Sequence, residues 1–145
     1  MIRLDRRIEV DRPANEVFER LTQIEELPRW QPAIVEAAVT SPGPLTRGST
    51  IRLVVDAGGR RTEALGRVTE LDRPERLAIE ATAGPAGLAT LLTVEAVGED
   101  RSLVSLEAEI RLGGMLRFVE GMVRGRIEAE APEAAVSIKR WLESD

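Results

Sequence analysis

The C-terminal part of the chain, residues 115–142, has the pattern of one long helix with a wide apolar face. Apolar residues recur there every three or four positions, which is the spacing of one side of a helix. The stripe consists of Leu116, Val119, Val123, Ile127, Ala134, Ile138 and Trp141, and Met115, Phe118 and Met122 widen its first half. A stripe this wide needs a broad second layer to cover it. A helix laid across a curved sheet tends to leave a hollow between the layers, and we expect the functional site in that hollow.

The rest of the chain supplies the strands of such a sheet. Residues 2–10 alternate between apolar and charged side chains, which predicts a strand with one buried face. Asp11 and Pro13 suit a helix start, and two short helical segments are expected before Trp30. Six further strands are predicted at 34–40, 49–56, 61–71, 76–83, 88–97 and 102–112, separated by turn sequences. Strands joined in order by short turns form an antiparallel sheet.

Length and composition narrow the function classes. A chain of 145 residues fits a single domain, 1–145, with room for a core. The net charge of −5 argues against nucleic acid as a partner, because that binding depends on positive charge. The longest uncharged run, 81–94, contains two glycines and a proline and is too short for membrane insertion. The N-terminus enters a strand pattern without an apolar signal region, so we expect a cytoplasmic protein.

The absence of certain residue types limits the chemistry. The sequence has no cysteine, histidine or tyrosine, which removes thiolates, the usual general base and the commonest metal ligand. It also contains no HExxH, CxxC, phosphate loop or dinucleotide fingerprint. We therefore expect no metal and no cofactor.

Several short segments resemble a known superfamily. These are IEVDRPANEVF (8–18), LPRW (27–30), GST (48–50), GRVTEL (66–71), PERL (74–77) and IKRWLE (138–143). They are similar to the SRPBCC superfamily, and most similar to its polyketide cyclase/dehydrase and lipid-transport group of START-like proteins. The resemblance implies an α+β helix-grip fold: a curved antiparallel sheet of about seven strands, two short helices after strand one, and the long C-terminal helix across the concave face. Members of this superfamily bind or transform different apolar molecules, so the resemblance is more specific for fold than for function.

The resemblance also implies a ligand cavity between the concave face and the C-terminal helix. Our assignment of inward faces gives a candidate lining of Trp30, Leu53, Val55, Val68, Ile79, Leu92, Val94, Leu106, Ala108, Met115, Phe118, Val119 and Met122. Plain core packing is the simpler interpretation of each of them, because apolar residues at strand or helix period are buried with or without a cavity. Trp30 is the most specific candidate, since it lies between two prolines and the resemblance puts it near the cavity mouth.

Two residues are candidates for catalysis, Arg6 on an inward position of the first strand and Glu70. A buried arginine can stabilise an enolate, and burial can move a carboxylate pKa towards neutrality. A solvated strand residue or a cross-strand ion pair is the simpler interpretation of both. Binding of an apolar small molecule (a lipid, isoprenoid or polyketide-like compound) is therefore favoured over the alternative, a polyketide cyclase or dehydratase acting on a poly-ketone. A homodimer through an exposed sheet edge stays a third, open alternative.

Overall fold

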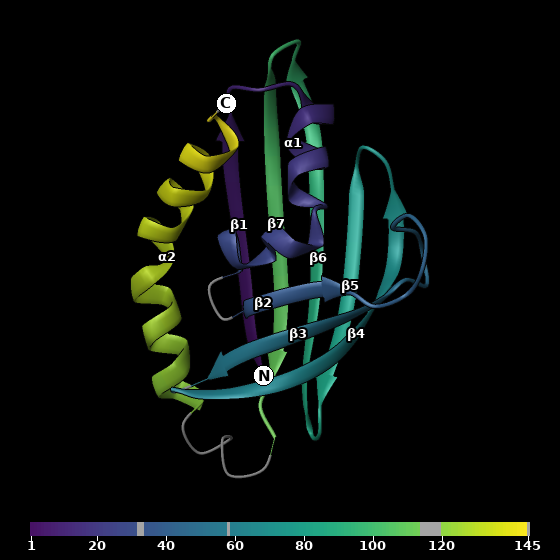
Figure 1. The fold of residues 1–145 in the computed structure, drawn as a ribbon. Coiled ribbons are helices and arrows are strands. Elements are labelled where there is room, and N and C mark those ends of the chain that lie inside the picture. The colour runs from purple at the N-terminus through teal and green to yellow at the C-terminus, as the bar shows by residue number, and fades with distance from the viewer. Residues whose placement is uncertain (32–33, 58, 114–119, 145) are drawn as a thin grey trace.

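The computed structural model describes residues 1–31, 34–57, 59–113 and 120–144. Seven antiparallel strands form one sheet in the order β1-β7-β6-β5-β4-β3-β2. The strands are β1 (Ile2–Val10), β2 (Ile34–Val39), β3 (Thr50–Ala57), β4 (Arg60–Asp72), β5 (Arg76–Ala83), β6 (Ala86–Gly98) and β7 (Arg101–Arg111). The helices are α1 (Ala14–Leu21), the short 3₁₀ helix η1 (Ile24–Arg29) and α2 (Glu120–Leu142). This arrangement, drawn in Figure 1, confirms the predicted helix-grip fold.

The element boundaries differ from the sequence prediction mainly at one turn. The connection after β5 was expected to be a loose four-residue loop, but Ala83 pairs directly with Ala86. Gly84 lies between them with φ +59°, a conformation that a two-residue hairpin turn favours and that glycine adopts freely. Strand β6 therefore begins two residues earlier than predicted. The first residues of the predicted C-terminal helix, 115–119, lie outside the described residues.

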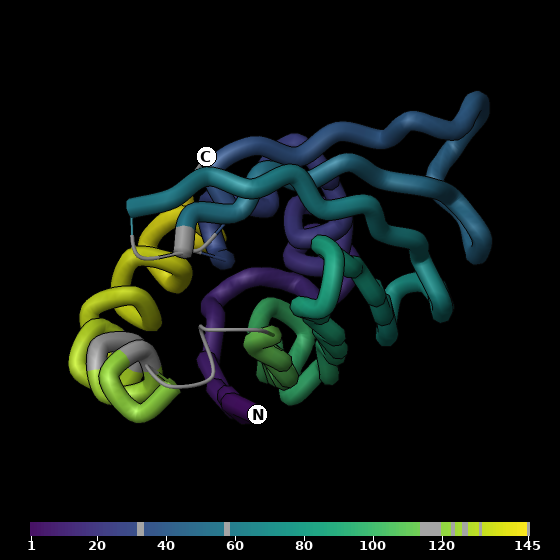
Figure 2. The backbone as a smooth tube through the Cα atoms, turned by 90° about the horizontal axis from the view of Figure 1, so that it is seen from below, coloured from purple at the N-terminus to yellow at the C-terminus, as the bar shows by residue number. Residues whose placement is uncertain are grey.

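The sheet is strongly curved. In Figure 2 it bends around an interior, and α2 lies on the open side of that bend. Irregular register in β2, β4 and β6 contributes, because a bulge bends its strand and increases the local twist. Gly66 of β4 marks a close approach: a Cβ there would lie 2.9 Å from the backbone oxygen of Glu80 and 3.1 Å from Cγ1 of Ile51. Neighbouring strands are thus packed too tightly at this point for any side chain.

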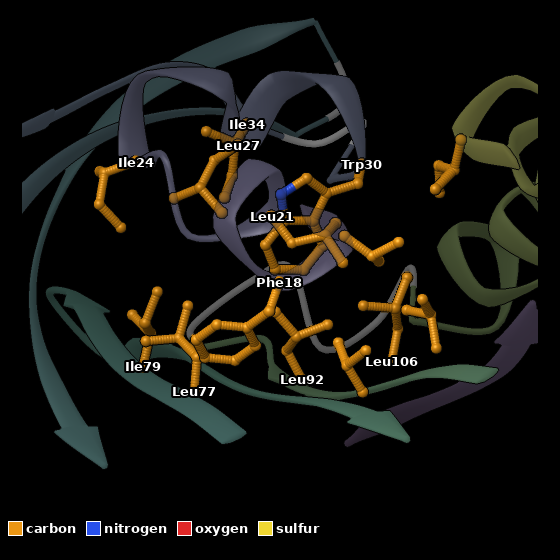
Figure 3. Packing of buried hydrophobic residues seen from close by; sticks show 14 of the residues in the cluster. Phe18, Leu21, Ile24, Leu27, Trp30, Ile34, Leu77, Ile79, Leu92 and Leu106 are labelled. Atoms are coloured by element: carbon orange, nitrogen blue, oxygen red, sulfur yellow. The ribbon is translucent and has the colours of Figure 1, made fainter. Parts of the chain in front are cut away.

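The core lies between the concave face and the two short helices. Helix α1 contacts β6 and β7, whereas η1 contacts β2. Figure 3 shows the ring of Phe18 pointing from α1 towards Leu77 and Leu92 of the sheet. These side chains belong to one buried cluster, to which η1 adds Ile24 and Leu27. The short helices therefore act as a plug inserted into the curve of the sheet.

Helix α2 runs beside β1, as Figure 1 shows, and is fastened to it at both ends. Near its start, a guanidinium nitrogen of Arg124 donates to the backbone oxygen of Met1 at 2.7 Å. Near its end, Lys139 donates to the backbone oxygen of Glu9 at 2.7 Å, and Ile138 is buried in the core. Across the described ranges, none of the helices has the length and apolar character needed to cross a membrane.

Candidate functional site

Strand register brings one polar residue into the middle of an apolar row on the concave face. Thr90 of β6 pairs with Ala108 on one side and with Ile79 on the other, and Ala108 in turn pairs with Leu4 of β1. Thr90 is buried, and its neighbours on the same face of β6 are Leu88 and Leu92. The row is therefore apolar except for one hydroxyl.

A small cavity opens beside this hydroxyl, between η1 and the sheet. Its lining consists of Leu27, Gln31, Ile34, Leu53, Ile79, Leu88 and Thr90. Inside it the side-chain amide of Gln31 donates a hydrogen bond to Oγ1 of Thr90 at 3.3 Å. The cavity volume of about 10 Å³ is room for about one water molecule. This cavity is much smaller than the hollow that we expected between the sheet and the C-terminal helix, and it lies beside η1.

Trp30 follows η1 directly and carries a polar group with no partner. Its side chain is only 2% exposed, and its Nε1 has no hydrogen-bond acceptor among the described residues. In Figure 3 this nitrogen lies on the side of the ring that faces Leu27 and Ile34, both of which line the cavity. Buried indole N–H groups nearly always find an acceptor, so this one calls for an explanation.

The structure separates the predicted lining residues into groups. Leu53 and Ile79 line the cavity. Trp30, Val68, Leu92, Val94, Leu106 and Ala108 are buried and Val55 is half-buried, but none of them is among the cavity's lining residues. Met122 was placed in the lining wrongly, since its side chain is 76% exposed. Met115, Phe118 and Val119 lie outside the described residues.

Sequence reasoning missed five lining residues, namely Leu27, Gln31, Ile34, Leu88 and Thr90. Two of them were within reach, because Leu88 and Thr90 share the alternation that placed Leu92 on the inner face. Gln31 had no such signal: it stands between Trp30 and a proline, where no strand or helix period applies.

Arg6 lies where the sequence placed it, on the concave face. It pairs in register with buried Leu106, and its side chain is half-buried. Burial removes water from the guanidinium and thereby lowers its pKa. Within the described residues, Arg6 has neither an ion pair nor a side-chain hydrogen bond. It is a partly desolvated cation that lies beside apolar side chains and has no ion-pair partner among the described residues.

Glu70, the second catalytic candidate, points away from the cavity. Leu71 pairs with buried Leu77, so Glu70 faces the opposite, outer side of the sheet. Its Oε1 accepts a hydrogen bond from Nε of Arg76 at 2.8 Å, which makes it half of a surface ion pair. Glu70 therefore does not face this cavity, and the ion pair is the simpler of the two interpretations given to it from the sequence.

The described residues that line the cavity offer hydrogen bonds and apolar surface, and none of them is ionisable. Gln31 and Thr90 stay uncharged at neutral pH, and the remaining lining residues are aliphatic. Among residues 1–31, 34–57, 59–113 and 120–144, no group of three or more carboxylates is placed to hold a metal ion. The amide of Gln31 and the hydroxyl of Thr90 can donate and accept hydrogen bonds with a neutral molecule.

Comparisons with known proteins agree with this description of the fold. The family model described as polyketide cyclase / dehydrase and lipid transport matches residues 1–143. A START superfamily protein from Mycobacterium smegmatis superposes with a TM-score of 0.72 at 18% identity, covering 97% of each chain. The Zhui aromatase/cyclase from Streptomyces sp. R1128 superposes with a TM-score of 0.68 at 18% identity, covering 97% of this chain and 90% of that one. No curated protein matches the sequence.

Proposed function

This chain belongs to the polyketide cyclase/dehydrase and lipid transport family of the SRPBCC superfamily, and we propose that it binds an uncharged apolar small molecule between the sheet and the short helices. The observation that supports this most is the cavity beside Thr90, because the described residues that line it are aliphatic apart from Gln31 and Thr90. Burial of apolar surface is worth about 25 cal/mol per Å², so a ligand that buries about 200 Å² gains about 5 kcal/mol before the costs of association.

Entry of such a ligand requires the short helices to move away from the sheet. The cavity now has room for one water, so a ligand must displace part of the plug. Arginine side chains of the short helices connect this plug to the end of α2. Arg29 stacks over the ring of Trp141 at 5.9 Å, and Arg20 donates to the backbone oxygen of Trp141 at 2.6 Å. A six-residue 3₁₀ helix also has few internal hydrogen bonds to lose.

Native mass spectrometry of freshly purified protein tests the proposal. We expect a fraction of the protein to carry a non-covalent mass of a few hundred daltons. Leu88→Trp, which fills the cavity, should abolish this fraction. Leu91→Trp is the matched control, since Leu91 lies on the outer face of the same strand and is also half-buried. Protein that carries no ligand and binds no added apolar compound would refute the proposal.

The second candidate function is catalysis on a poly-ketone, of the polyketide cyclase or dehydratase type. Arg6 supports it, because an uncompensated guanidinium on the concave face can stabilise a developing enolate. No partner base lies in the described lining, which is why we rank binding first. Turnover of a poly-β-ketone that is lost in Arg6→Ala and kept in Arg7→Ala would establish catalysis, and absence of turnover in the unmodified protein would dismiss it.

A further inference from the structure

We propose that Trp30 is a specificity-determining hydrogen-bond donor, and that the bound molecule presents a neutral oxygen acceptor to its Nε1. The inference rests on the proposed binding function and deepens it, because it states which chemical group the apolar ligand must carry. It starts from the one buried side-chain nitrogen or oxygen atom that has no partner in the described part of the chain.

The first step concerns the cost of that unpaired group. A buried donor without an acceptor destabilises a protein by about 1–3 kcal/mol, since folding removes its water without replacing it. Trp30 is 2% exposed, so bulk solvent does not reach its nitrogen. Phenylalanine would fill most of the same space without this cost. The nitrogen therefore opposes the stability of the free protein.

The second step concerns direction. Figure 3 shows Nε1 on the side of the indole that faces Leu27 and Ile34, which form part of the cavity wall. Trp30 does not line the cavity itself, so a ligand that enters between η1 and the sheet reaches this nitrogen by displacing the side chains of Leu27 and Ile34. The hydroxyl of Thr90 and the amide of Gln31 lie in the same cavity. The hydrogen bond between them is long, at 3.3 Å, so either group can form a hydrogen bond to a ligand in its place.

The third step concerns charge. Nε1 of Trp30 is uncharged, and so are the two polar groups that the described lining residues supply, the Gln31 amide and the Thr90 hydroxyl. A carboxylate would need a cation to offset its desolvation, but Arg6 lies on β1, two strands away from Thr90 on β6. A ketone, ester or ether oxygen accepts a hydrogen bond without that cost. The ligand is thus expected to be apolar with a neutral acceptor.

The test compares two probes that differ only at this acceptor. 2-Nonanone carries a carbonyl oxygen where 2-methyl-1-nonene carries a methylidene group of similar shape. Each is titrated into ¹⁵N-labelled protein, and both affinities and the indole Hε1 resonance of Trp30 are followed. Because the two probes differ in hydrophobicity, the measured quantity is their affinity ratio in the unmodified protein divided by that ratio in Trp30→Phe.

We expect this quotient to favour the ketone by about fivefold to tenfold, the value of one net hydrogen bond. The Trp30 Hε1 resonance should move downfield with the ketone and stay nearly unchanged with the alkene. Trp141→Phe is the matched control: Trp141 is half-buried near the end of α2, and its replacement should leave the ratio unchanged.

Three outcomes would overturn the inference. A quotient of one means that Trp30 does not select for the carbonyl oxygen of the ligand, although the proposed binding function is then still supported. An Hε1 resonance that ignores the bound ketone in the unmodified protein means the same, and it needs no variant to fold. Failure of both probes to bind refutes the proposed function, and the inference with it.

Discussion

Replacing Arg6 with methionine should stabilise the protein, whereas loss of a charged surface residue usually changes stability by less than about 0.5 kcal/mol. Arg6 lies on the concave face opposite Leu106, is half-buried, and has no ion-pair partner within the described residues. Burial lowers its pKa, which means that the folded state disfavours the charged form. Methionine has a similar length and keeps the contacts of the arginine stem without the charge.

The expected gain is about 1 kcal/mol. A half-buried methionine is worth about half of the roughly 1.5–3 kcal/mol of full burial, but the methylenes of Arg6 already contribute much of this burial in the unmodified protein. Relief of desolvation is then the main contribution, and substitutions of this kind commonly gain about 0.5–2 kcal/mol. For a chain of this size, 1 kcal/mol raises Tm by about 2–4 °C.

Urea denaturation followed by circular dichroism measures the effect. Arg7→Met is the control, because Arg7 is exposed on the outer face of the same strand and its substitution should change stability by less than about 0.5 kcal/mol. If Arg6→Met proves less stable than Arg7→Met, then Arg6 makes a stabilising interaction and the description of an uncompensated cation is mistaken.

Two further positions give predictions about stability. Gly66→Ala should destabilise the protein by about 1–2 kcal/mol in urea titrations, because the added Cβ would lie 2.9 Å from the backbone oxygen of Glu80. A variant that is more stable than the unmodified protein would contradict this close approach. The pKa of Glu143 is lowered, first by the hydrogen bond from the Asp11 amide and then by Lys139. The contribution of Glu143 to folding stability is therefore fully present above pH 4.5, the ordinary pKa of the group, and it disappears as the pH falls through the lower pKa of the folded state. When the pH is lowered from 5 to 3, Glu143→Gln should therefore lose less folding stability than the unmodified protein. The difference should be well under about 1 kcal/mol, because the group is solvated. Equal losses of stability in the two proteins would contradict the lowered pKa.

The sequence predicted the elements well where one period holds over a long segment. Alternation in β1 and β7 gave both the strands and their buried faces, because strand side chains must alternate regardless of what covers them. Arg6 was correctly placed on the inner face for the same reason, since it shares the parity of buried Ile8.

The errors occurred where the period is interrupted or drifts. Val68 and Glu70 would share a face in a regular strand, but a register shift lies between them and turns Glu70 outward. On α2, Met122 precedes buried Ile138 by 16 positions, a rotation of about 160° at about 100° per residue, so the two lie on nearly opposite sides of the helix. Neither the bulge in β4 nor the rotation that accumulates along α2 can be predicted from the spacing of apolar residues in a short segment.

The size of the cavity was beyond any sequence argument, since it depends on how far the short helices insert into the sheet. The same apolar residues are compatible with a closed core and with an open pocket. Only the polar groups among them distinguish these two arrangements. Trp30 with its free indole nitrogen and Arg6 with its unpaired guanidinium both lower the stability of the closed state. A protein selected for packing alone would replace each by an apolar residue of similar shape. The free nitrogen of Trp30, which follows η1, fits the ligand-bound state that we propose, because a bound molecule would supply the acceptor that the closed state lacks.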